Sequence, residues 1–247
     1  MQWAASRVSA LSALPAPSSG ADTIWVARFS LPEGPEASPP ASPPGWRPID
    51  FGGGRGSTSY RVSERDGRRC LQAATQGGGS GLLRPLEANP LAFPRLRWSW
   101  WVEGPVPGGD LRRKDGDDFA ARLYVNFRFD ASRSGLLQRL GHRLACRRFG
   151  ADAPGRALVY MWGNLEAAGT VAPNPYTEQA MVVVVRSGEL EAGRWWEEER
   201  NILDDFRSAF GEDPPGITSL AIMSDGDDTG GSASACYGDV LLLGGAA

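Results

Sequence analysis

The chain has 247 residues, of which 41% are hydrophobic and 22% are charged, as in a folded globular protein. A formal net charge of −3 excludes a general attraction of the whole chain to nucleic acid or to an anionic membrane. The single histidine, His142, excludes two-histidine metal motifs, and three cysteines without CxxC spacing argue against a disulfide framework or a structural zinc site.

Residues 1–21 are predicted to form a disordered tail or a degenerate leader, because their apolar core is short and interrupted by serine and proline. No later apolar run reaches the about 20 residues that span a bilayer, so we expect no transmembrane segment. A periplasmic or secreted location is therefore as compatible with the sequence as a cytoplasmic one. The oligomeric state is not indicated.

Residues 22–247 are predicted to form one β-sandwich domain, because short alternating segments are separated by turn-forming residues. Arg65-Asp66-Gly67 is expected to be a hairpin turn. Segment 169–177 is expected to be a loop because it holds two prolines, and segment 181–188, with four consecutive valines, a buried strand. The strands are expected at 21–30, 57–62, 70–74, 80–83, 94–104, 121–129, 157–164, 181–188, 217–225 and 234–243, with a further short strand just before Asn201.

Two segments have helical spacing instead. In 134–150, four leucines recur on one side among arginines, which predicts a surface helix; contact with a membrane or nucleic acid is the alternative. Asn201 is expected to cap a helix that ends at Gly211. With about ten strands and no βαβ alternation, the sequence predicts an all-β fold: an antiparallel, jelly-roll-type β-sandwich with one or two peripheral helices.

The stretch from Leu111 to Phe129 changes from a charged loop into a strand with two different faces. Ala121, Leu123 and Val125 alternate with Arg122, Tyr124 and Asn126, the pattern of a half-buried antiparallel strand. In a strand, the adjacent Asp117 and Asp118 would point to opposite faces, so they are not expected to form a two-carboxylate catalytic pair.

Polar and aromatic side chains gather on the polar faces of several predicted strands. Aromatic rings stack on the apolar face of a sugar, and amides and charged groups bond its hydroxyls, so this mix is typical of a glycan-binding surface. The alternative is that the tryptophans fill the core. The predicted ligand-binding residues are Asp117, Asp118, Arg122, Tyr124, Asn126, Trp162, Asn164, Asn174 and Tyr176.

Asp225, Asp227, Thr229 and Gly230 have the spacing of the first half of an EF-hand calcium loop. Cys236 stands at the twelfth position, where a bidentate glutamate is required, so an EF-hand is excluded. A simpler structural Ca²⁺ site with Asp225 and Asp227 as ligands stays open. No other cofactor is predicted.

Four segments, at 114–125, 160–177, 194–217 and 220–240, together resemble the bacterial family known as domain of unknown function 3047. The resemblance covers roughly residues 22–243. Its members usually look exported, whereas this chain lacks a clear leader and has Cys236 where an aromatic residue is common. The resemblance implies a single domain with one site region and no particular reaction.

Three hypotheses about function follow. The first is a binding module for a carbohydrate or cell-envelope glycan, with no nucleic-acid partner. The second is a polysaccharide hydrolase or lyase that uses Asp117 or Asp118 with Arg122 and Tyr124. The third is a structural envelope protein without a small ligand, which buried tryptophan side chains would favour.

Overall fold

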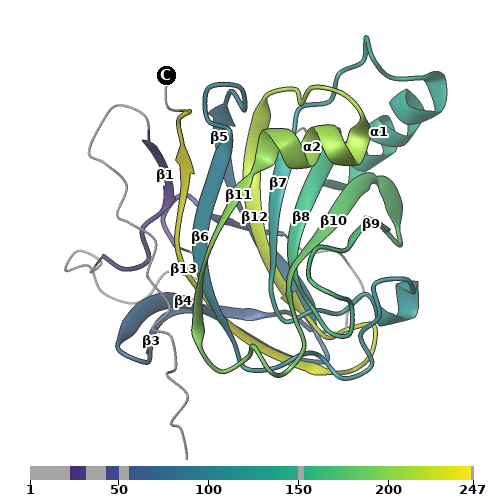
Figure 1. Cartoon of the computed structure of the whole chain (residues 1–247). Helices are drawn as coiled ribbons and strands as arrows, with labels where there is room; N and C mark the ends of the chain where they lie inside the picture. Colours follow the sequence, from purple (N-terminus) through teal and green to yellow (C-terminus); the bar gives the residue numbers. More distant parts are fainter. Residues whose placement is uncertain (1–22, 32–42, 50–55, 150–152, 246–247) are drawn as a thin grey trace, which may run out of the picture.

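The computed structural model describes residues 23–31, 43–49, 56–149 and 153–245, so the tail predicted at 1–21 lies outside the described residues (Figure 1). Two β-sheets form the body of the molecule. The first sheet has the order β11 (Trp195–Asn201), β6 (Arg95–Val102), β13 (Ser232–Leu243), β4 (Arg68–Gln76) and β3 (Ser59–Arg65), and β1 (Thr23–Ala27) also pairs with β13. The second has the order β2 (Arg47–Ile49), β5 (Gly79–Ala88), β12 (Ile217–Asp225), β7 (Arg122–Phe127), β8 (Arg156–Gly163), β10 (Thr177–Ser187) and β9 (Val171–Asn174).

The main core lies between the two sheets and follows from the alternation in their strands. Trp98 and Trp100 of β6 face this core from the first sheet, and Leu123 and Val125 of β7 face it from the second. The Trp98 ring stacks on Tyr160 with a centroid distance of 5.3 Å. The all-β sandwich expected from the sequence is therefore confirmed, whereas the jelly-roll connectivity stays a prediction.

A second, smaller core covers the outer face of the second sheet. Leu111 and Phe119, in the segment between β6 and β7, pack on side chains of β8 and β10, namely Val159, Met161, Val182 and Val184. Val183 points instead into the main core. Both faces of β10 are therefore covered, which explains its continuous run of valines.

The short helices and turns form largely where the sequence predicts them. Asp66 and Gly67 have φ angles of 51° and 72° in the hairpin between β3 and β4, as a tight primed turn requires. The Asn201 side chain accepts from the backbone N–H groups of Leu203 and Asp204 at the start of α2 (Ile202–Phe210), and Gly211 ends this helix with a φ of 73°. The leucine-rich segment forms α1 (Leu136–Phe149).

Two details of the second sheet differ from the sequence-based expectation. β8 and β10 pair in parallel, so the sandwich is not purely antiparallel. Segment 169–177 is not all loop, because β9 occupies its centre and pairs with β10. Proline is tolerated there because β9 is the edge strand, where a missing N–H costs no ladder hydrogen bond. In the described part of the chain, no helix has the length and hydropathy to cross a membrane.

Candidate functional site

The register of the second sheet brings the start of β7 beside the end of β12. Arg122 pairs with Met223 on one side and with Met161 of β8 on the other. Because these neighbours run antiparallel to β7, the loops after β12 and β8 emerge at the edge where β7 begins. The segment before β7 crosses the same edge and carries Asp117 and Asp118, just after a short 3₁₀ turn, η1 (Lys114–Gly116).

Arg122 is the centre of a buried charged network, defined here as Asp117, Arg122 and Asp225. Its side chain is 2% exposed, and its Nη1 donates to Asp117 Oδ1 at 3.1 Å. Its Nη2 contacts the Asp225 carboxylate and the Asp117 backbone carbonyl. Asp225 Oδ1 also accepts from the Phe119 backbone N–H at 2.9 Å. The network therefore fastens the segment before β7 to the end of β12.

One guanidinium faces two carboxylates in this network, and burial shifts the pKa of one of them, Asp225. Burial raises the pKa of Asp225 to about 7, because the Arg122 guanidinium opposes this only in part and the neighbouring Asp117 charge adds to it. Burial also raises the pKa of Tyr124 to about 12. Asp225 is thus a carboxyl group that titrates near neutral pH.

Asp118 has other hydrogen-bond partners than its neighbour Asp117, although both lie in a loop and not in a strand. Its carboxylate accepts from the backbone N–H groups of Asp228 at 3.2 Å and Thr229 at 2.5 Å. Through these two hydrogen bonds, the fully buried Asp118 anchors the turn between β12 and β13.

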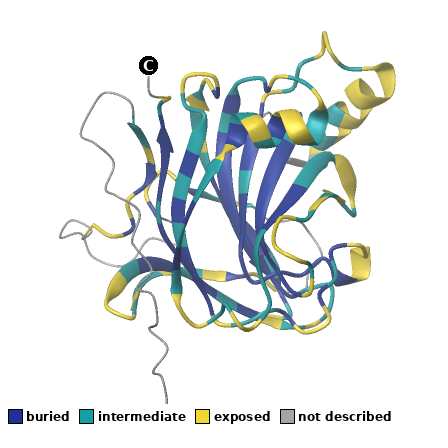
Figure 2. Cartoon of the chain, viewed as in Figure 1, coloured by how far each residue is buried: buried dark blue, intermediate teal, exposed yellow. Residues whose placement is uncertain are grey.

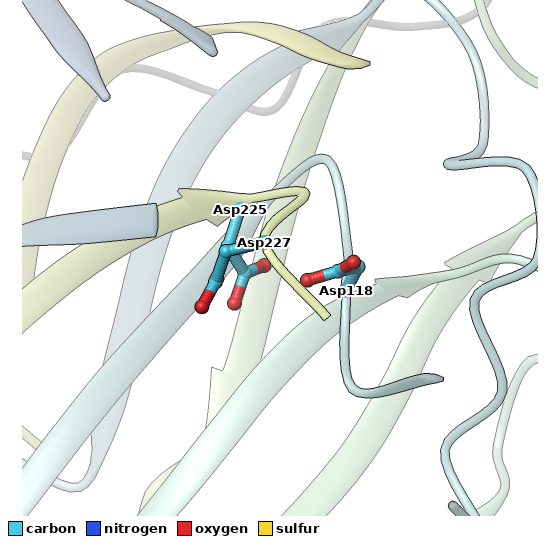
Figure 3. Close-up of side chains that lie close together, drawn as sticks. All are labelled: Asp118, Asp225 and Asp227. Carbon is cyan, nitrogen blue, oxygen red and sulfur yellow. The ribbon is translucent and has the colours of Figure 1, made fainter. Parts of the chain in front are cut away.

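Asp118 also comes close to the two aspartates that the sequence suggests as metal ligands (Figure 3). One oxygen from each of Asp118, Asp225 and Asp227 lies within 4.8 Å of the others. Gly79 leaves room for this arrangement, since a Cβ there would lie 2.2 Å from Asp227 Oδ1. Carboxylate oxygens are the ligands that Ca²⁺ prefers, so the donor set is suitable for this ion.

Next to the network lies a group of exposed and partly buried side chains, which we call the rim: Lys114, Asn174, Tyr176 and Asp228. The Tyr176 hydroxyl is 2.9 Å from the Lys114 carbonyl oxygen and 3.0 Å from Asp228 Oδ2. Asn174 Nδ2 donates to Asp117 Oδ2 at 3.3 Å, which joins the rim to the buried network. The two contacts of its hydroxyl hold Tyr176 in place, while the residue is 54% exposed to solvent.

The prediction that Trp162 lies on a ligand surface is wrong. Tyr160 pairs with Leu123, and Tyr124 pairs with Val159, so Tyr160 and Trp162 share the face of Leu123 and point into the main core. Trp162 is fully buried, and its Nε1 donates to the Gly188 carbonyl at 3.2 Å. The predicted polar-aromatic surface is therefore split between the two faces of the second sheet.

Three further predicted residues are placed where they stabilise the fold and not at the rim. Asn126 Nδ2 donates to Ser219 Oγ at 3.0 Å, and the partly buried Tyr124 packs against the second core. Asn164 Oδ1 accepts from the Val106 N–H at 2.8 Å, and its Nδ2 donates to the Asp118 carbonyl at 2.9 Å. Asn126 and Asn164 are each 5% exposed.

Sequence reasoning missed Lys114 and Asp228. Asp228 lies in the acidic run Asp-Gly-Asp-Asp, but the calcium-loop spacing selects only its first and third residues. Its partner Tyr176 is 52 positions away in the chain. No local pattern connects two residues at that separation, so the rim becomes visible only in the folded structure.

Comparisons with known proteins identify a family but no activity. No functionally curated protein matches the chain. Among solved structures, the glycoside hydrolase domain of Endo-D from Streptococcus pneumoniae R6 is similar at a TM-score of 0.36 and 9% identity, over 80% of this chain and 21% of that one. The K3 cleaved adhesin domain of Lys-gingipain from Porphyromonas gingivalis is similar at a TM-score of 0.36 and 14% identity. This similarity covers 82% of this chain and 93% of that domain.

Both structural similarities are too weak to support an inference about this chain. The match to a family model is stronger evidence, because it extends over residues 44–241. This range includes β7, the turn after β12 and the rim. The chain belongs to the family described as protein of unknown function DUF3047.

Proposed function

We propose that this protein binds a carbohydrate, of the kind found in cell-envelope glycans, at the rim formed by Lys114, Asn174, Tyr176 and Asp228. One observation carries the proposal: the half-exposed Tyr176 ring stands beside an amide and a carboxylate, with its hydroxyl within hydrogen-bonding distance of two oxygens. Among the predicted ligand-binding residues, Tyr176 is the aromatic side chain that the structure leaves open to solvent.

The chemistry of the rim suits a sugar. The ring of a tyrosine offers an apolar plane for the C–H groups of a pyranose, and amide and carboxylate groups bond hydroxyls in defined directions. Because the Tyr176 hydroxyl lies next to Asp228 and the Lys114 carbonyl, the ring loses little freedom when a ligand binds. A single aromatic ring supports a small site for one or two sugar units.

The buried network supports this rim from below. Asp117 binds Arg122 through Oδ1 and Asn174 through Oδ2, so the position of the amide depends on the network. The turn that carries Asp228 is held by the carboxylate of Asp118. We assign these residues a positioning role and the rim the contact with the ligand.

The hydrolase or lyase hypothesis is less favoured by the geometry. Asp118 is fully buried with both carboxylate oxygens bonded to backbone N–H groups, and Arg122 is enclosed by Asp117 and Asp225. A pKa of about 12 makes Tyr124 a poor base near neutral pH. The observation in favour of an enzyme is the pKa of Asp225 near 7, within the range of a general acid.

The hypothesis of a structural envelope protein is favoured by the tryptophans. Six of them are buried, namely Trp46, Trp98, Trp100, Trp101, Trp162 and Trp196. The described part of the chain therefore has too few open tryptophans for a broad sugar-binding surface, and the smaller rim is the candidate that is left. Whether a glycan binds at all is the property that separates the two hypotheses.

A glycan array probed with the wild-type chain and with Tyr176→Ala tests the proposal. We expect binding to a limited set of glycans, and a loss of about tenfold in affinity in the variant, since it removes the apolar area of the ring together with a stacking contribution of about 0.5–1.5 kcal/mol. Trp25→Ala is the matched control, because Trp25 is 37% exposed and lies on β1, at the opposite edge of the molecule from β9 (Figure 1).

No binding by the wild type, or equal binding by wild type and Tyr176→Ala, contradicts the proposal. Release of reducing ends from any polysaccharide, lost in Asp225→Asn, would establish the enzyme hypothesis in its place. The cation suggested by the sequence stays a prediction. It would lie at Asp118, Asp225 and Asp227, beneath the turn that carries Asp228.

A further inference from the structure

Helix α1 exposes a continuous apolar surface that the rest of the described chain leaves uncovered. Leu136, Leu137, Leu140 and Leu144 are between 55% and 85% exposed. At about 100° per residue, they fall within an arc of about 100° on one side of the helix. Figure 1 shows α1 beside the sandwich, and Figure 2 shows most of its surface coloured as exposed.

The opposite side of α1 attaches the helix to the protein. His142 stacks on Phe129 with parallel rings and a centroid distance of 3.8 Å. His142 Nε2 also lies 3.0 Å from the Ala153 carbonyl oxygen. Ala145 and Cys146, on the same side, are partly buried. The orientation of α1 is therefore set, and it directs the leucines outward.

The charge on α1 has one sign. Between Leu136 and Phe149 there is no aspartate or glutamate, whereas Arg139, Arg143 and Arg147 are exposed. On the helical projection, Arg139 and Arg143 lie just outside one edge of the leucine arc, and Arg147 lies within the arc near that edge. Long arginine side chains at such positions place their apolar stems against lipid and their guanidinium groups among the headgroups.

We propose that α1 docks the protein on an anionic phospholipid surface, with its leucines inserted among the acyl chains and its arginines among the phosphates. A basic helix with an apolar face is the arrangement that binds the interface of such membranes. With 14 residues the helix is about 21 Å long, so it lies in the plane of the interface.

Other occupants of this surface fit less well. A second copy of the chain, packed symmetrically through the leucines, would bring the arginines of both copies together, and α1 has no carboxylate to pair with them. Nucleic acid would use the arginines but leave the leucines in water. The negative net charge of the whole chain also makes binding dependent on this local basic patch.

Co-sedimentation of the full chain with lipid vesicles tests the proposal. We expect binding to phosphatidylcholine vesicles that contain phosphatidylglycerol, little binding to pure phosphatidylcholine, and release by salt. Arg143→Gln is expected to weaken binding about fivefold. The double variant Leu137→Ser with Leu140→Ser is expected to weaken it tenfold or more.

Matched controls exist for both changes. Leu165→Ser with Leu190→Ser removes two leucines that are 83% and 97% exposed outside α1, and Arg61→Gln removes an exposed arginine from β3. Binding should be unchanged in both. No vesicle binding, equal binding to both kinds of vesicle, or a dimer in solution that the leucine double variant dissociates would overturn the proposal.

Discussion

The buried network and the rim lie side by side and each contains aspartate and a cationic residue, but they are exposed to water to different extents. Asp117, Arg122 and Asp225 are 7%, 2% and 3% exposed, whereas Tyr176 is 54% exposed. Asp117 belongs to the network and also binds Asn174 of the rim. The comparison indicates that burial, more than residue type, separates the positioning residues from those available to a ligand.

The physical reason is the cost of an unpaired charge. Inside the protein, removing the guanidinium that pairs with a buried carboxylate lowers the stability of the fold by several kcal/mol. The three network residues therefore stabilise the fold only as a set. At the rim, water can replace a lost partner, so we expect a substitution there to cost little stability and, on the proposed function, to change mainly the affinity for a glycan.

The largest effect is expected from Arg122→Gln. It leaves Asp117 and Asp225 buried without their cation, so the free energy of unfolding should fall by about 3–5 kcal/mol in denaturant titrations. Arg128→Gln is the control, because Arg128 is 58% exposed where it pairs with Glu87, and it should cost about 0–1 kcal/mol. Equal losses in the two variants would remove the distinction between network and surface.

The second-largest effect is expected in the pH dependence of the free energy of unfolding, to which Asp225 of the network contributes. Asp225 has a pKa of about 7 in the folded chain and about 3.9 when unfolded, so the folded state holds more protons between these values. Stability should therefore fall as the pH rises from about 4 to 7, by up to about 1.4 kcal/mol per unit. In Asp225→Asn, measured with a chelator present, this slope should be absent.

Calcium is expected to have an intermediate effect. If Asp118, Asp225 and Asp227 bind the ion, a calcium concentration of 100 times its dissociation constant should raise the free energy of unfolding by about 2.7 kcal/mol. Thermal melts with calcium and with EDTA measure this change. Asp227→Asn should abolish it, and identical melting temperatures for the wild type in both buffers would exclude the site.

The smallest change in stability is expected from Tyr176→Phe. The ring stays, but its contacts with Asp228 and the Lys114 carbonyl are lost, so the unfolding free energy should change by less than about 1 kcal/mol. Glycan affinity should fall only a few fold, because the ring is less fixed. Isothermal titration calorimetry measures this affinity, and a loss as large as in Tyr176→Ala would show that the hydroxyl contributes more than the stacking.

Local features of the fold could be predicted from the sequence because each depends on neighbouring residues. The alternation of Leu123 and Val125 with polar residues predicted the core face of β7, and Asn201 predicted the start of α2. The parallel pairing of β8 with β10 could not be predicted, because it depends on a crossover that leaves no local pattern.

The candidate site was only partly predictable for the same reason. The structure does bring together Arg122, Asp117 and Asn174. Trp162 does not join them, because the register between β7 and β8 places Met161 beside Arg122 and directs Trp162 to the other face of the sheet. Alternation assigns residues to two faces of a strand without showing which face of its neighbour they share. Aromatic residues at such positions are ambiguous between a binding surface and the core.

The central claim is that the rim, and not the buried network, contacts a glycan. Side-chain amide signals in ¹⁵N NMR spectra test it directly, because Asn174 lies at the rim while Asn126 and Asn164 are buried. Titration with a glycan found on the array should shift the Asn174 signal and leave the other two unchanged. Shifts confined to Asn126 and Asn164, or an unmoved Asn174 signal at saturation, would contradict the account.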